Sequence, residues 1–256
     1  MALDDATLAA RQLDSQFAIM EAVVAGGRGS SAVRPADGVL AILCPCIPGR
    51  SMPNSVLYRD PGALTDAVLD ELQDVYAAAG VRAWTVWVRP GDGLLAARLG
   101  ARGHVHDAQP LLMCGELARM DLEPKVRLDL EPSPGWAMLG RLNDRAFGLD
   151  GMFEQVLDGV QDPASRLWVA RVGGEPAAAL LVRVHQGDAE VYCVAVVPEA
   201  RGRGLSRELL RAALAAARDA GATTTSLEST ALGEPVYRSL GYRALGRFGM
   251  WERRQA

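Results

Sequence analysis

Residues 191–221 read VYCVAVVPEARGRGLSRELLRAALAAARDAG, and this stretch decides the fold. The residues before Pro198 are mostly β-branched, aromatic or small apolar residues of the kind that form buried strands, and the proline ends that run. From Leu205 onward, apolar residues recur at the spacing of one helix face. The stretch therefore predicts a β-strand, a short loop and a helix in direct succession.

The loop of this unit, RGRGLS at 201–206, has the chemistry of an anion site. The first amides of a helix have no partner within it, and they lie at the positive end of the helix dipole. The two glycines let a phosphate approach the backbone, and Arg201 and Arg203 carry guanidinium groups that suit phosphate oxygens. A Walker loop would need a lysine, and Lys125 is the only one in the chain. A dinucleotide fingerprint would need a glycine where Arg207 stands.

The remaining pattern is an arginine, two residues, a glycine, one residue and a small residue, with Ser206 in the last position. It resembles the acetyl-coenzyme A loop of the GNAT superfamily of N-acetyltransferases, where glycine or alanine is usual in place of this serine. A second segment strengthens the resemblance. LEST at 227–230 and GEPVYRSLGY at 233–242 are similar to the second strand and the last helix of that family.

The resemblance implies an α/β (α+β) fold with a mixed, mostly antiparallel twisted sheet flanked by helices. In it the strands before and after the central helix splay apart into a cleft that takes acetyl-CoA as co-substrate. Backbone groups of the first strand would pair with the pantetheine arm, and the loop would hold the pyrophosphate. The residues implied are Val194, Ala195 and Val196 for the arm and Arg201, Gly202, Arg203, Gly204, Leu205 and Ser206 for the pyrophosphate.

Three side chains are candidates for the chemistry. A primary amine with a pKa of about 10 must lose a proton before it can attack a thioester. Glu190, at the start of the strand, is the first choice as general base and Glu228 the second, although both could equally be solvated strand-end carboxylates. Tyr237 matches the family's tyrosine on the last helix, which can protonate the departing thiolate; the alternative is a tyrosine that fills the core.

The first half of the chain resembles a degenerate copy of the second. A shift of 221 − 80 = 141 positions places Gly80 on Gly221 and, without a gap, LG at 99–100 on LG at 240–241. A chance match between abundant residue types stays open. Opposite RGRG at 201–204 the first half has DPGA at 60–63, with an anion in place of a cation and a proline that lacks an N–H. Ala96 stands opposite Tyr237, so the first copy is not expected to bind coenzyme A.

Two domains are expected, a degenerate GNAT-like domain at 1–122 and a catalytic GNAT domain at 123–256, joined through the polar, proline-marked segment 120–125. For the first we expect a helix at 4–25, strands at 39–44, 54–58 and 82–88, helices at 65–79 and 94–99, and a hairpin-like pair at 104–117. For the second we expect a strand at 126–130, helices at 135–147 and 153–160, strands at 167–172 and 178–184, the central unit, and closing strands within 242–253.

Composition narrows the function classes. The 256 residues are 49% apolar, with a net charge of −4 and interspersed charges, which argues against nucleic-acid binding and against a polybasic membrane surface. The N-terminal residues lack the pattern of a signal peptide, so a cytoplasmic protein is expected. Cys44, Cys46, Cys114 and Cys193 do not have the spacing of a metal site, and we expect reduced thiols and no metal.

These observations predict an N-acetyltransferase that moves an acetyl group from acetyl-CoA to a primary amine of a small molecule or peptide, by direct attack in a ternary complex. The alternative is a module that binds acetyl-CoA without catalysis and signals its presence to a partner. Acceptor identity and oligomeric state stay open, a homodimer through edge strands included.

Overall fold

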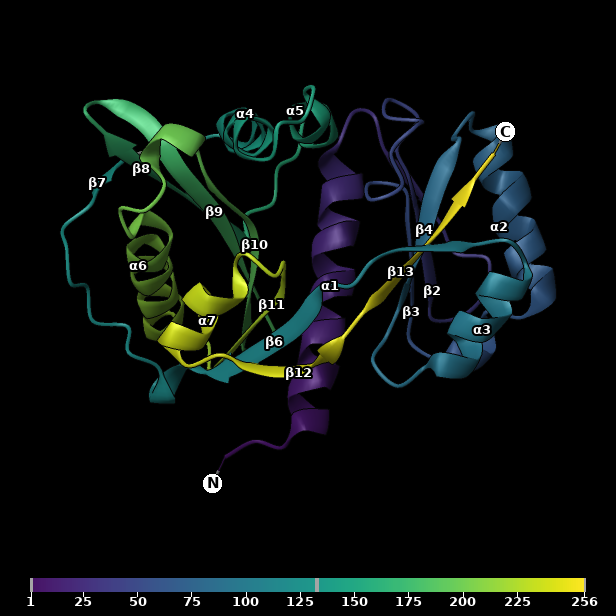
Figure 1. The fold of residues 1–256 in the computed structure, drawn as a ribbon, viewed down its shortest axis with the longest axis horizontal. Coiled ribbons are helices and arrows are strands. Elements are labelled where there is room, and N and C mark those ends of the chain that lie inside the picture. Colours follow the sequence, from purple (N-terminus) through teal and green to yellow (C-terminus); the bar gives the residue numbers. More distant parts are fainter. Residues whose placement is uncertain (1, 132–133, 256) are drawn as a thin grey trace.

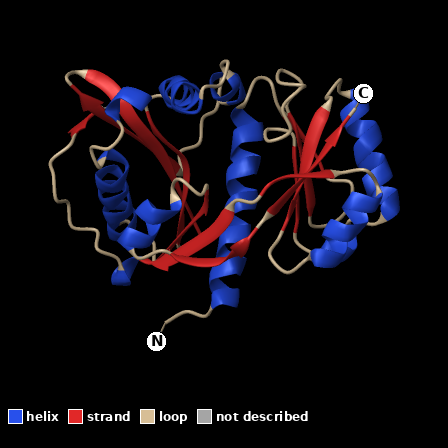
Figure 2. Cartoon of the chain, viewed as in Figure 1, coloured by secondary structure: helices blue, strands red, loops and turns tan. Residues whose placement is uncertain are grey.

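The computed structural model describes residues 2–131 and 134–255, which form two sheets with helices against them (Figures 1 and 2). The strands of one sheet are β1 (Ser31–Val33), β2 (Val39–Leu43), β3 (Ser55–Tyr58), β4 (Ala83–Val88), β5 (Val105–Ala108) and β13 (Gly249–Arg254). Those of the other are β6 (Leu111–Glu116), β7 (Asp129–Leu130), β8 (Ser165–Val172), β9 (Glu175–His185), β10 (Asp188–Val196), β11 (Thr224–Ser229) and β12 (Arg243–Arg247). The helices are α1 (Asp5–Gly26), α2 (Asp66–Ala78), α3 (Gly93–Ala101), α4 (Trp136–Phe147), α5 (Met152–Val156), α6 (Leu205–Asp219) and α7 (Glu234–Leu240).

Both sheets are mixed and mostly antiparallel, as the sequence predicts. The first has the order β1-β2-β3-β4-β13-β5 and the second β12-β6-β11-β10-β9-β8-β7. The parallel pairs are β3 with β4 and β10 with β11. In each, a helix connects the two strands, which is the crossover that parallel pairing requires.

The 141-residue shift reproduces element boundaries along part of the chain. It carries β4 onto β11 (83 + 141 = 224 and 88 + 141 = 229) and the start of α3 onto that of α7 (93 + 141 = 234). It also carries the end of α2 onto the end of α6 (78 + 141 = 219). Before α2 the register is lost, because the end of β3 would fall at 199 whereas β10 ends at Val196.

The last strand of each half crosses into the other sheet. β6 lies between β11 and β12, and β13 lies between β4 and β5. The two crossing connections meet where the Phe248 amide donates to the Pro110 carbonyl at 2.9 Å, and Figure 1 shows β12 leading into β13 across the middle of the molecule.

The expected hairpin at 104–117 is therefore wrong, since β5 and β6 belong to different sheets. The division at 122/123 likewise does not separate the sheets, and the closing strands at 242–253 do not both remain in the second half. An alternating pattern indicates which face of a strand is buried but not which sheet it joins.

Helix α1 lies between the two sheets (Figure 1). It begins after Asp4, whose carboxylate accepts from the Thr7 amide at 2.7 Å as an N-cap. Leu13 and Phe17 pack on the first sheet, while Ile19 joins the core between the second sheet and α4. The helix is thus buried on two sides and contributes to both cores.

Helices α2, α3 and α6 cover the outer faces, whereas α4 and α5 lie on the same face of the second sheet as α1. α2 and α3 pack against the first sheet, and α6 packs against the second through Leu209, Leu210 and Leu214. None of the helices in the described part of the chain combines the length and apolarity needed to cross a bilayer.

Candidate active site

A cleft opens where β10 and β11 separate. The two strands pair only through 188–190 and 224–226, although β10 continues to Val196 and β11 to Ser229. Beyond that point β10 keeps its pairing with β9 on its other edge. The edge that faces β11 is therefore left for another partner, and the predicted splayed cleft is confirmed.

A bulge in β10 lies beside this opening. Pairing with β9 is irregular between Tyr192 and Ala195, and Cys193 has a φ of 55°, which is rare for a residue with a side chain. The amide of Asn143 on α4 holds the bulge by donating to the Cys193 carbonyl at 3.1 Å and to the Leu139 carbonyl at 2.9 Å. Burial raises the pKa of the Cys193 thiol to about 12, so this thiol is a poor nucleophile. The sequence carried no signal for the bulge.

The loop at 201–206 presents a helix terminus without a side-chain cap. Gly202 and Gly204 have φ values of 75° and 74°, a conformation that glycine adopts without strain, and open space surrounds both. The first bond of α6 runs from the Glu208 amide to the Gly204 carbonyl at 3.2 Å. Within the described residues, no acceptor contacts the amides of 205–207. The loop therefore leaves the first amides of α6 open at the helix terminus.

The two arginines of the loop contact the backbone around it. Arg201 donates to the Val196 carbonyl at 3.3 Å and to the Ala146 carbonyl at 2.5 Å, which ties the loop to the ends of β10 and α4. Arg203 makes one long bond, of 3.4 Å, to the Glu199 carbonyl. Arg201 is thus engaged in holding the loop, whereas the exposed Arg203 can turn toward a ligand.

The corresponding loop of the first half is closed by its own side chains. The Asp60 carboxylate accepts from the Gly62 amide at 2.9 Å, and Thr65 caps α2 by accepting from the Val68 amide at 3.3 Å. The hydroxyl of the buried Tyr58 bonds Asp92 and the Arg89 amide, which links the ends of β3 and β4. An anion would find these amides already occupied.

Glu190 and Glu228 lie together on the face of the second sheet that α1 covers. Glu190 is fully buried and accepts from the Tyr192 hydroxyl at 2.6 Å. Burial, reinforced by the neighbouring Glu228, raises the pKa of Glu190 well above its ordinary value. Glu228 lies two residues beyond the last residue of β11 that pairs with β10, and it is partly exposed. Burial raises its pKa to about 7.

Helix α1 brings polar side chains to these carboxylates. The amide nitrogen of Gln12 lies 2.5 Å from Oε1 of Glu228 and 3.4 Å from Oε1 of Glu190. The Ser15 hydroxyl donates at 3.1 Å to the buried Asp188. Sequence reasoning missed these residues because it followed only the apolar face of the helix. The signal was the group of uncharged polar residues at 12, 15 and 16, which lie among the apolar residues of the helix.

Tyr237 lies beside the end of β11, with its ring edge against Gly233 and packed on Tyr242 at 5.7 Å between ring centroids. It is 7% exposed, and burial raises the pKa of its hydroxyl. Within the described residues, no group hydrogen bonds that hydroxyl. The ring is part of the core, and the hydroxyl keeps its hydrogen-bonding capacity for a ligand.

Acidic side chains on α4, on α5 and just after α5 have partners of their own. Asp144 accepts from the amides of Phe153 and Glu154 at 2.9 and 3.0 Å. Glu154 pairs with Arg141, and Asp158 with Arg28. These acidic residues therefore give no unpaired charge for a cationic acceptor.

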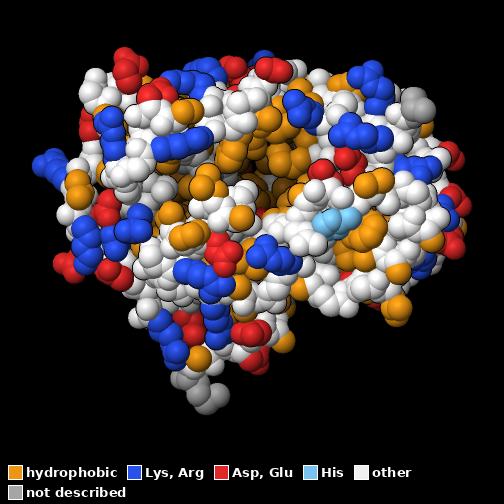
Figure 3. Space-filling model, in the orientation of Figure 1, with side chains coloured by type: hydrophobic (Ala, Val, Ile, Leu, Met, Phe, Trp, Pro, Cys, Tyr) orange, Lys and Arg blue, Asp and Glu red, His pale blue; other side chains and the backbone are white. Residues whose placement is uncertain are grey.

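Figure 3 shows a hollow near the centre of the molecule, in which hydrophobic side chains gather.

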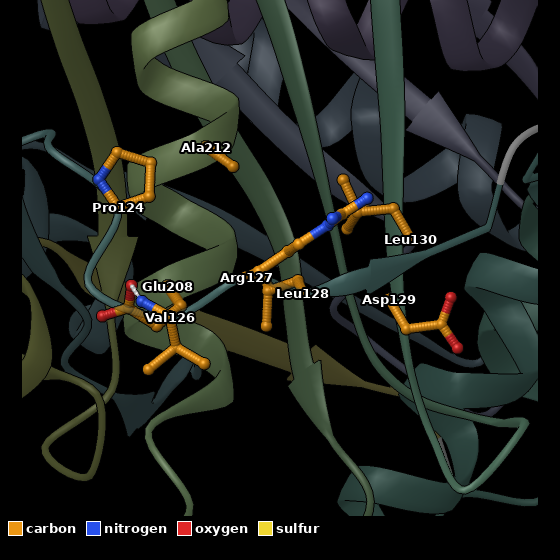
Figure 4. A pocket seen from close by; sticks show the side chains of 8 residues that line it. All are labelled: Pro124, Val126, Arg127, Leu128, Asp129, Leu130, Glu208 and Ala212. Carbon is orange, nitrogen blue, oxygen red and sulfur yellow. Dashed lines mark hydrogen bonds between the residues drawn. The ribbon is translucent and has the colours of Figure 1, made fainter.

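A cavity of about 740 Å³ lies between the segment that joins the halves and the outer side of α6 (Figure 4). Glu208, on its wall, accepts from the amides of Lys125 and Val126 at 2.8 and 3.2 Å and pairs with Arg211. These bonds fix the joining segment to α6. None of the candidate cofactor or catalytic residues lines this cavity.

Comparison with known proteins identifies relatives of the fold. The model of the acetyltransferase (GNAT) family matches residues 136–242. A GCN5-related N-acetyltransferase from Kribbella flavida is 17% identical, with a TM-score of 0.68 over 95% of this chain and 96% of its own. A tandem GNAT protein from the clavulanic acid biosynthesis pathway is 15% identical, with a TM-score of 0.55 over 99% and 97% of the two chains.

A GCN5-related N-acetyltransferase from Sphaerobacter thermophilus is 18% identical, with a TM-score of 0.57 over 85% of this chain and 80% of its own. A comparison with curated protein sequences finds no match. At such identities the structural likeness concerns the fold, and it confirms the predicted fold class over both halves of the chain.

Proposed function

We propose that this protein transfers an acetyl group from acetyl-CoA to a primary amine of a small molecule or peptide, because its residues 136–242 match the model of the acetyltransferase (GNAT) family. The observation that carries this proposal is the separation of β10 from β11 after Glu190, with an uncapped helix terminus at its far end. The cleft offers backbone partners for an extended arm, and the loop offers amides for a diphosphate.

Each candidate residue takes a role in this scheme. Val194, Ala195 and Val196 bind the pantetheine arm through the free edge of β10. The amides of 202–206 and the side chain of Arg203 bind the pyrophosphate, while Arg201 holds the loop in place. Residues 1–122 do not bind a second cofactor, because Asp60 occupies the Gly62 amide and Thr65 occupies the Val68 amide in the corresponding loop.

For the chemistry we assign the base to Glu228 and not to Glu190. Burial raises the pKa of the fully buried Glu190 well above its ordinary value and so favours its protonated form. Glu228, beyond the paired part of the two strands and with a pKa raised to about 7, can change its protonation state near neutral pH. Glu228 takes a proton from the ammonium group, directly or through a water. The neutral amine attacks the thioester carbonyl, the carbon–sulfur bond breaks, and the Tyr237 hydroxyl protonates the departing thiolate. The nitrogen loses its second proton as the amide forms, and this proton restores the Tyr237 hydroxyl directly or through a water.

Gly204→Asp is expected to weaken acetyl-CoA binding roughly 30-fold or more. The new carboxylate would occupy the amides of the loop, as Asp60 does in the first half, and would repel the pyrophosphate; a loss of about 2 kcal/mol corresponds to that factor. Gly173→Asp is the matched control, because Gly173 also has a positive φ and open space around it but lies in the turn between β8 and β9. Titration calorimetry would measure both, and equal affinities would contradict the assignment.

Tyr237→Phe is expected to lower the rate of coenzyme A release roughly 10²-fold while acetyl-CoA binding is retained, because only the proton donor is removed. Tyr242→Phe is the control, since its hydroxyl contacts Thr225 inside the core. A thiol-trapping assay with a panel of amines would measure the rates. If the unchanged protein binds acetyl-CoA but releases no thiol with any amine, the non-catalytic sensor is supported instead.

A further inference from the structure

We propose that Gln12 of α1 is a positioning residue of the second half's site, where its side-chain amide holds the Glu228 carboxylate at the mouth of the cleft. The inference rests on the proposed function, because it gives Glu228 its role as base. It assigns to the first half a direct part in the reaction, through a residue that lies 216 positions from its partner.

The contact between Gln12 and the carboxylates is buried and hydrogen bonded. Gln12 is 1% exposed, and its amide nitrogen lies within hydrogen-bond distance of both carboxylates, closer to Glu228 than to Glu190. An amide nitrogen has two hydrogens and does not titrate, so it remains a donor at every pH. It is therefore suited to hold a carboxylate whose own protonation state changes during a reaction.

The helix that carries Gln12 is fixed along its length. One residue before it, Arg11 donates to the hydroxyls of Thr223 and Thr224 at the start of β11. Three residues after it, Ser15 donates to Asp188 on β10. These contacts leave the helix little freedom to slide or rotate against the second sheet, so β10 and β11 set the position of the amide.

Gln12 also favours the ionised form of Glu228. Burial raises the pKa of Glu228, the hydrogen bond from Gln12 lowers it, and the charge of Asp188 raises it. The carboxylate beside Glu228 is Glu190 on β10. The other titratable or charged groups near these two are Tyr192 on β10, Cys114 on β6, Arg11 on α1 and Arg243 on β12. Of the two arginines, Arg243 pairs with Asp5 at 3.0 Å and Arg11 bonds threonine hydroxyls. The amide is thus the donor that contacts Glu228 directly.

The test compares Gln12→Met with Gln16→Met. Both replace a buried glutamine of α1 by an apolar side chain of similar length, but Gln16 contacts neither carboxylate. Titration of the Glu228 carboxyl carbon by NMR, assigned from its absence in Glu228→Gln, follows the pKa without any need for turnover. We expect Gln12→Met to raise this pKa by about one pH unit or more, and Gln16→Met to leave it unchanged.

The same variants give a second readout in the pH profile of kcat/KM. Its acidic limb is expected to move to higher pH in Gln12→Met by the amount seen in the titration, a shift that a loss of packing alone would not produce. Gln12→Asn retains the amide on a shorter side chain and is expected to give an intermediate shift, which provides a second variant if the methionine form folds poorly.

Two results would overturn the positioning role: a folded Gln12→Met in which Glu228 titrates as in the unchanged protein, or a titration shift with no movement of the acidic limb. Failure of the proposed function looks different, since the unchanged protein would then show no acetyl transfer to any amine while the NMR titration of Glu228 could still be followed.

Discussion

Residues 123–256 produced alone are expected to be insoluble or to unfold without a cooperative transition. The second sheet would lack β6, which pairs with both β11 and β12 and buries Leu112, Met113 and Cys114. Without it, two strands would present open edges, which promote aggregation. The face that α1 covers would also be exposed, with Glu190 and Asp188 on it.

The informative counterpart is to produce residues 1–122 and 123–256 together as two chains. We expect a 1:1 complex that elutes as one species in size-exclusion chromatography and melts in one transition, because each fragment fills the gap in the other's sheet with β6 or β13. The control is to produce each fragment separately and mix them afterwards, which should recover less complex. A soluble, cooperatively folded 123–256 fragment would contradict the view that the exchanged strand is required.

Glu228→Gln is expected to lower kcat/KM roughly 10²- to 10⁴-fold at neutral pH, because the amide cannot accept a proton from the amine. In the unchanged protein the base must be ionised, so activity should rise with pH through about 7, the pKa of Glu228, and the variant should lose this limb. Steady-state assays between pH 5.5 and 9 would measure both.

Glu190→Gln is the matched control, since burial favours the protonated form of Glu190 and the amide resembles the acid in shape. We expect less than about a tenfold effect. Folding should be preserved in Glu228→Gln. A carboxyl group whose pKa is higher in the folded than in the unfolded protein stabilises the folded state less and less as the pH rises from the lower pKa to the higher one. At pH 8 the charge of Glu228 therefore does not stabilise the folded protein, and its removal should not lower the melting temperature. A larger loss of kcat/KM in Glu190→Gln than in Glu228→Gln would indicate that Glu190 is the base.

The sequence predicts those parts of the fold that local patterns encode. The unit β10–α6–β11 follows from the run before Pro198, the helical spacing after Leu205 and the glycines between them. The closure of the first half's loop follows from Asp60 and Pro61. Boundaries differ from expectation where local signals are weak: the strand expected at 126–130 is formed only at Asp129–Leu130, and the helix expected at 153–160 ends at Val156.

Contacts between residues that are far apart in the sequence could not be predicted. The exchange of β6 and β13 depends on which edge each strand meets, and an alternating pattern says nothing of that choice. The contact between Gln12 and Glu228 joins residues that only the packing of α1 between two sheets brings together. The bulge at Cys193 depends on Asn143 from another helix, so no pattern within β10 could reveal it.

The exchanged strands also constrain how the protein is made. A ribosome completes α1 to β5 early, yet the first sheet lacks the strand between β4 and β5 until Gly249–Arg254 have left the exit tunnel. The nascent chain must therefore carry an incomplete sheet through the synthesis of more than half of its length, so it has a long interval in which chaperones can bind it. A stop codon that removes only the last strand would damage the half that was synthesised first.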